Sequence, residues 1–204
     1  MGAKEKYNRV SCIYDFLEAV MENSAFSRYR MILMKELPCN GKVLEIGIGT
    51  GKNISYYPSS VEVTGIDFSI GMLKFAKKRQ KAFQGSKLTL LEMDAQNMTF
   101  ESNTFDAVVS TFVFCTVPDP VKGLKEAKRV LKKEGKAIFL EHMRSQNGFI
   151  NTFLYLANVI TKPLFGTSTV RDTKRNILQA GFEIEKEIHL VFDVVRIFVC
   201  TKKT

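Results

Sequence analysis

Short strand-like runs alternate with helical patterns between residues 42 and 143, and few folds accommodate that order. β-Branched and other apolar residues are concentrated in five runs, at 42–48, 61–67, 87–94, 105–114 and 136–143. Two of the intervening segments, 69–83 and 120–135, have apolar residues three or four positions apart, and Gly135 is expected to end the second helix. This alternation predicts βαβ units, and therefore a doubly wound α/β fold with a parallel sheet covered by helices on both faces.

The C-terminal part of the chain has a different pattern. Two strand-like runs, 182–190 and 194–203, follow one another with only a short connection. They predict an antiparallel hairpin at the edge of the sheet. A chain of 204 residues with 45% hydrophobic content suffices for one well-buried domain and is too short for two ordinary ones, so residues 1–204 are expected to form a single domain.

The first strand-like run ends in a glycine-rich segment, VLEIGIGTG, at residues 43–51. In open α/β sheets, ligands bind beyond the carboxyl ends of the strands, where glycine lets the backbone approach a ligand closely. The spacing argues against phosphate ligands. A dinucleotide fingerprint would need glycine at Lys52, and a P-loop would need Ser or Thr at Asn53.

Acidic side chains mark the ends of the first three strand-like runs. Glu45 lies in the first run, Asp67 ends the second and Asp94 ends the third. Asp67 is placed to accept hydrogen bonds from both hydroxyls of a ribose, and Asp94 to accept one from an exocyclic amine such as that of adenine. Each acid taken alone could equally be a helix N-cap or a turn residue. Three at successive strand ends favour a nucleoside-binding site.

These segments together resemble the class I S-adenosylmethionine-dependent methyltransferases. The resemblance covers about residues 40–143 and includes VTGIDFSIGMLKFAKKR, LLEMDAQNMTFESNTFDAVVSTFVF and VPDPVKGLKEAKRVLKKEGKAIFLEH. It implies a Rossmann-like, seven-stranded, mostly parallel sheet with an antiparallel C-terminal strand. It also implies S-adenosyl-L-methionine as cofactor, held by residues around its methionine portion (Glu45, Gly47, Gly49, Gly51), its ribose (Asp67) and its adenine (Phe68, Met72, Asp94, Ala95).

Methyl transfer is an in-line displacement at a carbon that is already activated, so the protein mainly supplies proximity, alignment and exclusion of water. A base is needed only if the acceptor must lose a proton. His142, which follows Glu141 at the end of the fifth run, is the candidate base, and the alternative is a structural histidine. With two histidines and four cysteines that form no CxxC pair, no metal site is expected.

The methyl acceptor is expected to contact two segments outside the core. Residues 1–37 predict cap helices over the cofactor, with apolar residues at helical spacing (Tyr7, Val10, Ile13, Tyr14, Leu17). An insert at 147–166 carries an apolar stripe (Phe149, Phe153, Leu156, Ile160). This insert could pack on the sheet, form a lid that lines an apolar acceptor pocket, or rest on a membrane surface.

Resemblance narrows the acceptor to three classes. The segment YNRVSCIYDFLE is similar to the N-terminal part of quinone-biosynthesis C-methyltransferases and bacterial phospholipid N-methyltransferases, and EHMRS with the following aromatic helix resembles small thiol methyltransferases of membranes. The long N-terminal anchor of the thiol group is not found before this segment. A quinone carbon, a lipid amine and a thiol therefore remain open as acceptors.

The net charge of +9 is attributed mainly to solvated helix faces, with attraction to anionic lipid or nucleic acid as the alternative. A small-molecule acceptor is expected, without nucleic-acid binding, and peripheral membrane contact is left open. A nucleic-acid methyltransferase and a non-catalytic cofactor-binding regulator are the competing hypotheses. The dispersed cysteines and the absence of a signal-peptide pattern predict a cytoplasmic protein.

Overall fold

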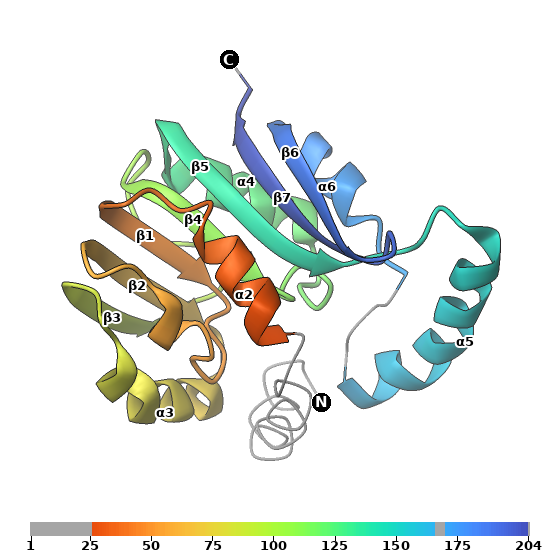
Figure 1. Cartoon of the computed structure of the whole chain (residues 1–204), viewed down its shortest axis with the longest axis horizontal. Coiled ribbons are helices and arrows are strands. Elements are labelled where there is room, and N and C mark those ends of the chain that lie inside the picture. Colours follow the sequence, from red (N-terminus) through yellow and green to blue (C-terminus); the bar gives the residue numbers. More distant parts are fainter. Residues whose placement is uncertain (1–25, 166–169, 204) are drawn as a thin grey trace.

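The computed structural model describes residues 26–165 and 170–203, which contain one seven-stranded sheet (Figure 1). The strand order is β3-β2-β1-β4-β5-β7-β6, with the first five strands parallel and β7 antiparallel to both β5 and β6. The strands are β1 (Gly41–Ile46), β2 (Val61–Asp67), β3 (Lys87–Glu92), β4 (Phe105–Thr111), β5 (Leu131–His142), β6 (Phe182–Val191) and β7 (Val195–Lys202). The predicted doubly wound sheet and its C-terminal edge hairpin are confirmed.

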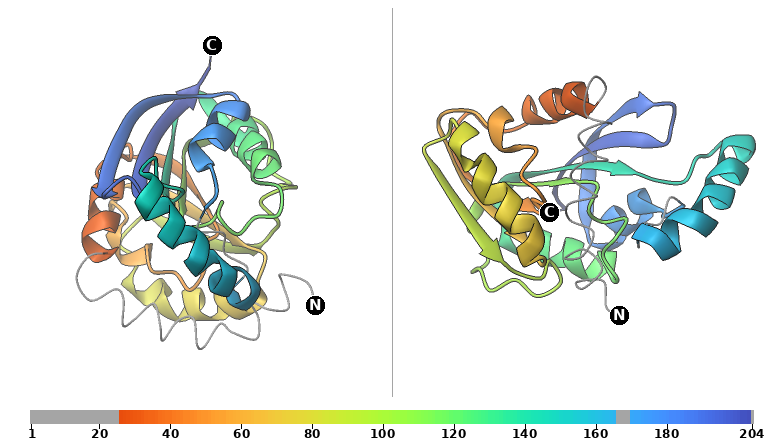
Figure 2. Two further views of the ribbon diagram at one scale, coloured as in Figure 1. Left: turned by 90° about the vertical axis from the view of Figure 1, so that its right-hand side faces the viewer. Right: turned by 90° about the horizontal axis from the view of Figure 1, so that it is seen from below.

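Helices cover both faces of this sheet, as the alternation of patterns predicted (Figures 1 and 2). Helices α4 and α6 pack on one face, and α2 and α3 pack on the other. The helices are α2 (Ser27–Met34), α3 (Ile70–Arg79), α4 (Pro120–Val130), α5 (Gly148–Phe165) and α6 (Thr173–Gln179), with 3-10 turns η2 (Ile54–Tyr56) and η3 (Gln80–Ala82). Of the predicted cap helices, α2 is described. Tyr7, Val10, Ile13, Tyr14 and Leu17 lie outside the described residues.

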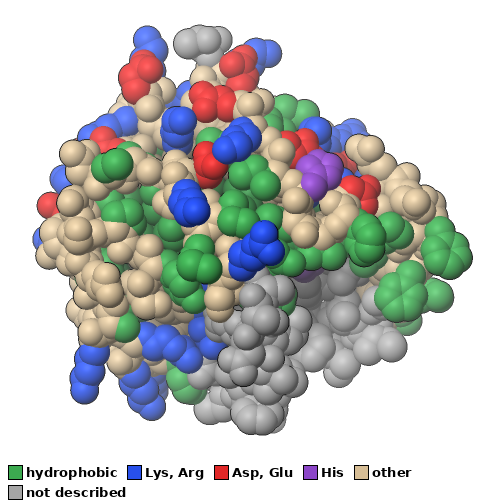
Figure 3. Space-filling view, in the orientation of Figure 1, with side chains coloured by type: hydrophobic (Ala, Val, Ile, Leu, Met, Phe, Trp, Pro, Cys, Tyr) green, Lys and Arg blue, Asp and Glu red, His purple; other side chains and the backbone are tan. Residues whose placement is uncertain are grey.

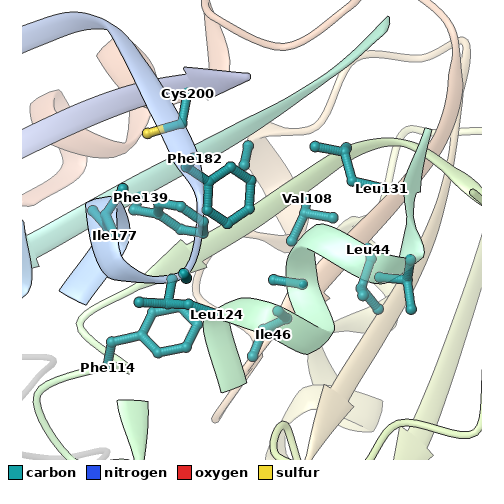
Figure 4. Close-up of a cluster of buried hydrophobic side chains, with 14 of the residues drawn as sticks. Leu44, Ile46, Val108, Phe114, Leu124, Leu131, Phe139, Ile177, Phe182 and Cys200 are labelled. Carbon is teal, nitrogen blue, oxygen red and sulfur yellow. The ribbon is translucent and has the colours of Figure 1, made fainter. Parts of the chain in front are cut away.

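The central strands are buried on both faces, and their side chains form two cores. On one face Ile46 and Phe139 pack against Leu124 of α4 and Ile177 of α6, as Figure 4 shows. On the other face, residues of the same strands pack against Leu33 of α2. Near-continuous apolar runs in the sequence reflect this burial, because a parallel strand covered on both sides has no solvent-facing side to keep polar.

Helix α4 ends earlier than its sequence pattern predicted. The pattern extends to Gly135, but the helix stops at Val130 and strand β5 begins at Leu131, which has extended backbone angles (φ −70°, ψ 139°). Leu131 is fully buried and pairs with Phe105 of β4. Its burial in the core outweighs the local helical pattern. Gly135 lies inside β5, where a Cβ atom would come within 2.9 Å of the carbonyl oxygen of Asp106.

Helix α5 occupies the predicted insert and stands off from the sheet (Figures 1 and 2). Its apolar stripe does not pack on the sheet, because Phe149 is 88% exposed, Phe153 71% and Leu156 65%. The packing interpretation is therefore wrong for these three residues, and the side chain of Ile160 lies outside the described ones. None of the described helices combines the length and the hydropathy required to cross a bilayer.

Candidate active site

A pocket of about 260 Å³ lies at the carboxyl ends of β1, β2 and β4 and the segment after β3. This is the edge of the sheet where the strand order reverses between β1 and β4, the location favoured by ligands in open α/β folds. All the predicted cofactor-binding residues except Gly51 line it, namely Glu45, Gly47, Gly49, Asp67, Phe68, Met72, Asp94 and Ala95. The fold thus brings together side chains from three strand ends that are far apart in the sequence.

The glycine-rich segment forms one wall of the pocket. Gly47 and Gly49 have φ angles of +66° and +56°, which other residues adopt only with strain. A Cβ atom on Gly47 would come within 2.5 Å of the Val113 side chain, whereas one on Gly49 would meet nothing closer than a backbone oxygen at 3.9 Å. Gly49 therefore leaves space open beside the pocket. Gly51 lies outside the lining, where a Cβ atom would come within 2.9 Å of the Cα atom of Ala76 in α3.

Asp67 connects the glycine-rich segment to the end of β2. One carboxylate oxygen accepts a hydrogen bond from the backbone N–H of Gly49 at 2.9 Å, and the other accepts one from Ser69 at 2.8 Å. Asp67 is buried, and burial raises its pKa to about 6. Ser69, not Asp67, caps α3 by accepting from the N–H of Met72. Each Asp67 oxygen retains a lone pair for a ligand hydroxyl.

Asp94 lies two residues beyond the end of β3, at the exposed rim of the pocket. Its carboxylate accepts hydrogen bonds from the backbone N–H of Gln96 at 2.8 Å and from the Gln96 side chain at 3.1 Å. This is the turn geometry that the sequence left open as an alternative. The turn fixes the carboxylate at the rim, so the structural role does not compete with a ligand contact.

A buried hydrogen-bond network surrounds Glu45, which is 2% exposed. Asn53 donates to one carboxylate oxygen at 2.6 Å and the Tyr57 hydroxyl donates to the other at 2.8 Å. Arg30 of α2 donates to the Asn53 side-chain oxygen at 2.7 Å. Burial raises the pKa of Glu45 to about 7, although the hydrogen bonds from Tyr57 and Asn53 oppose that shift. Arg30 and Asn53 also line the pocket.

Sequence analysis did not identify Arg30, Asn53 or Tyr57 as site residues. Arg30 belongs to the predicted cap segment, but nothing in a helical pattern distinguishes a buried arginine from a solvated one. Asn53 entered only as the residue that excludes a P-loop. These side chains meet because η2 and α2 both pack beside β1, and that proximity has no local sequence signal.

His142 does not line the pocket. Its ring stacks on Phe112, which does line it, with the ring centroids 6.0 Å apart. Nδ1 is buried and has no hydrogen-bond partner among the described residues, and burial lowers the imidazole pKa to about 4. The ring is therefore neutral at pH 7. Its role as a base stays a prediction.

Glu141, next to His142, holds the loop after β4 in place. One carboxylate oxygen accepts hydrogen bonds from the backbone N–H groups of Val113 and Phe114, each at 3.0 Å. Burial raises the pKa of this carboxyl to about 7. Because Val113 lines the pocket and packs directly against Gly47, Glu141 positions the part of the wall that adjoins the glycine-rich segment.

Comparisons with known proteins identify the family of this chain. A family model described as a methyltransferase domain matches residues 44–139. A demethylmenaquinone methyltransferase of Bacillus cereus is 33% identical over 172 residues, which cover 78% of this chain and 70% of that protein. A phosphatidylethanolamine N-methyltransferase of Cereibacter sphaeroides is 38% identical over 109 residues, which are 53% of this chain and 54% of that protein. The matched region thus spans only about half the length of this second relative.

A crystal structure of an S-adenosylmethionine-dependent methyltransferase from Thermotoga maritima has the same fold, with a TM-score of 0.72 at 23% identity over 98% of this chain and 99% of that one. Fold and site define an open α/β protein with carboxylates at the strand ends that line one pocket. The chain belongs to the class I S-adenosylmethionine-dependent methyltransferases. Membership of this family implies S-adenosylmethionine as the cofactor.

Proposed function

We propose that this protein transfers a methyl group from S-adenosylmethionine to a small, apolar acceptor. The observation that carries the proposal is the open space at Gly49 directly beside the buried Asp67 carboxylate, which accepts a hydrogen bond from the Gly49 amide. A ligand that is rich in donors and poor in phosphate suits this arrangement. The bound cofactor would supply a methyl group on a sulfonium sulfur, which leaves as a neutral thioether.

The pocket residues divide between the parts of the cofactor by their chemistry. Asp67 accepts hydrogen bonds from the two ribose hydroxyls. Phe68 and Met72 provide apolar surface for the adenine, and Asp94 and Ala95 lie at the rim beside the adenine amine. Glu45, with its raised pKa, becomes ionised near a cationic ligand and balances the ammonium group. Two cationic side chains, Arg30 and Lys52, line the pocket, and Arg30 is the better suited to the ligand carboxylate because its guanidinium matches the planar carboxylate group.

The acceptor approaches from the side of the pocket formed after β4. That side is lined by Phe112, Val113, Thr116 and Val117 and carries no charged side chain. The names of the two relatives give demethylmenaquinone and phosphatidylethanolamine as their methyl acceptors, which supports an apolar or lipid-borne acceptor for this protein. The quinone ring carbon is favoured over the lipid amine and the thiol, because the menaquinone relative matches more of this chain.

His142 is the proposed base for an acceptor that must lose a proton. A pKa of about 4 keeps its imidazole unprotonated at neutral pH, but also makes it a weak base. It stacks on Phe112 and does not line the pocket, so direct contact with an acceptor would require a rearrangement around Phe112. A transfer that requires no proton removal would leave His142 with a structural role.

Two experiments test the proposal in sequence. Calorimetry should detect binding of S-adenosylhomocysteine and none of NAD; the reverse preference would refute it. Labelled S-adenosylmethionine is then incubated with a demethylmenaquinol analogue, phosphatidylethanolamine, an aliphatic thiol, duplex DNA and RNA. Label should enter the ring of the demethylmenaquinol analogue, because the reduced ring has the electron-rich carbon that attacks the methyl group. Label in nucleic acid would favour a nucleic-acid methyltransferase, and cofactor binding without transfer to any acceptor would favour a regulator.

A further inference from the structure

Helix α5 exposes to water the side that a helix of a water-soluble protein normally buries. The exposed side chains follow one another at intervals of four, three and three residues and so share one face of the helix. They are Phe149 (88% exposed), Phe153 (71%), Leu156 (65%) and Val159 (72%). Isolated exposed apolar residues are common on protein surfaces, but a continuous row of large ones marks an interaction surface. We call this row the apolar face of α5.

The opposite side of the helix carries polar side chains beside the half-buried Leu154. Asn151 and Asn158 are only partly exposed, and the side-chain oxygen of Asn151 is buried with no hydrogen-bond partner among the described residues. Both amides thus lie on the less exposed side while large apolar groups face outward. Leaving the row uncovered forfeits the hydrophobic stabilisation of four large side chains. The arrangement is favourable only when something apolar covers the outer face.

The segment that contains α5 has basic but no acidic side chains. Residues 142–171 contain no aspartate or glutamate, whereas Lys162 and Arg171 are basic. Arg144 is paired with Asp172, and Asp193 binds Ser145 and Gln146 before the helix, so the excess positive charge comes from the other basic residues. Helix α3 exposes three more lysines, Lys74, Lys77 and Lys78. Figures 1 and 2 place α3 and the C-terminal half of α5 at the same end of the molecule, and Figure 3 shows Lys and Arg side chains projecting from that end. The partner that complements both helices is apolar inside and negatively charged at its surface.

We propose that α5 docks on the surface of an anionic lipid bilayer. Its apolar face enters the boundary between headgroups and acyl chains, and the basic side chains of α3 contact the anionic headgroups. A second copy of the chain fits less well. The 18 residues of α5 form a surface of about 27 Å by about 10 Å, well under the roughly 800 Å² per partner of a stable dimer. Docking does not depend on methyl transfer, but it would bring a bilayer-borne acceptor to the pocket.

Vesicle co-sedimentation with the full chain tests this docking. Vesicles of phosphatidylcholine with phosphatidylglycerol should bind the protein, and vesicles of phosphatidylcholine alone should bind it much less. Leu156→Ser removes part of the apolar face, and Leu178→Ser is a matched control, because Leu178 is 52% exposed on α6. The first change should weaken vesicle binding about tenfold or more, and the second should leave it unchanged.

Both substitutions replace exposed side chains, so both variants should keep the wild-type melting temperature and the wild-type affinity for S-adenosylhomocysteine. Absence of binding by the wild type to anionic vesicles would overturn the proposal, as would equal losses in the two leucine variants. Concentration-dependent dimerisation that Leu156→Ser abolishes, without vesicle binding, would assign the face to a second copy instead. Vesicle binding without cofactor binding would leave docking intact while refuting the proposed function.

Discussion

Replacing Asp67 with asparagine tests the centre of the proposed cofactor site. The carboxylate holds two backbone amides, those of Gly49 and Ser69, one on each oxygen. Asparagine has the same size but only one acceptor oxygen, so one amide loses its partner and the ligand loses a charged acceptor. The substitution therefore acts on the ligand directly and on the glycine-rich segment through its hydrogen bond.

The expected loss of affinity follows from the bonds that the charge would make. A hydrogen bond to a charged group contributes about 1.5–3 kcal/mol, so losing one such bond to a ribose hydroxyl weakens cofactor binding by about tenfold to a hundredfold. Fold stability should change less. Asparagine loses one amide contact, but it also removes the cost of burying a charge, the cost that raises the pKa of Asp67 to about 6.

Calorimetry with S-adenosylhomocysteine measures the affinity, and thermal unfolding measures the stability of the same samples. Glu62→Gln is the control, because this substitution removes a carboxylate from the exposed start of the same strand, β2. The affinity of this variant for S-adenosylhomocysteine should equal that of the wild type. A folded Asp67→Asn variant with wild-type affinity would show that the ribose is held elsewhere, and would remove the reason for assigning this strand end to the cofactor.

Three further results are expected. Burial raises the pKa of Asp67 from 3.8 to about 6 and that of Glu45 from 4.5 to about 7, so both groups bind protons more tightly in the folded state. The stabilisation from this proton binding is therefore present below about pH 4 and lost as the pH rises to about 7. Cofactor affinity needs ionised Asp67, so it should rise over the same pH range. A cofactor affinity that does not change from pH 5 to 8 would contradict this. Gly49→Ala should lower the free energy of unfolding by about 1 kcal/mol, because the φ angle of Gly49 is +56°. The added methyl group projects into the open space beside the pocket, so cofactor affinity should fall more strongly. Thermal unfolding measures the first effect and calorimetry the second. Leu124 is fully buried, so Leu124→Ala should lower the free energy of unfolding by about 2–5 kcal/mol and the melting temperature by roughly 4–20 °C. The control Leu178→Ala, at an exposed position, should change the free energy of unfolding by less than about 0.5 kcal/mol. Equal melting temperatures for the two variants would refute the description of the core.

Local periodicity was sufficient to predict the sheet and most of its ligand-binding edge. Strand β2 has the predicted bounds, and the two C-terminal strands pair as the predicted hairpin. Strands β1, β3 and β4 end two or three residues before the predicted positions. Parallel strands nevertheless bring their carboxyl ends to one edge. The glycines and acids that follow β1 and β2 therefore had to meet there once the alternation was recognised. The error at the end of α4 arose where the burial of Leu131 overrode a continuing helical pattern.

The sequence by itself thus determined the fold class, the position of the pocket and the acids at its edge, because the alternation of strand and helix patterns implies parallel strands whose carboxyl ends meet at one edge. Tertiary structure decided the distant partners of two of those acids, Gly49 for Asp67 and Tyr57 for Glu45. Arg30 reaches Asn53 across 23 residues, and His142 stacks on Phe112. Both contacts depend on how distant elements pack. It also decided that the apolar face of α5 points away from the sheet. A periodic pattern identifies which side of a helix is apolar, but what covers that side depends on neighbours that the pattern does not encode.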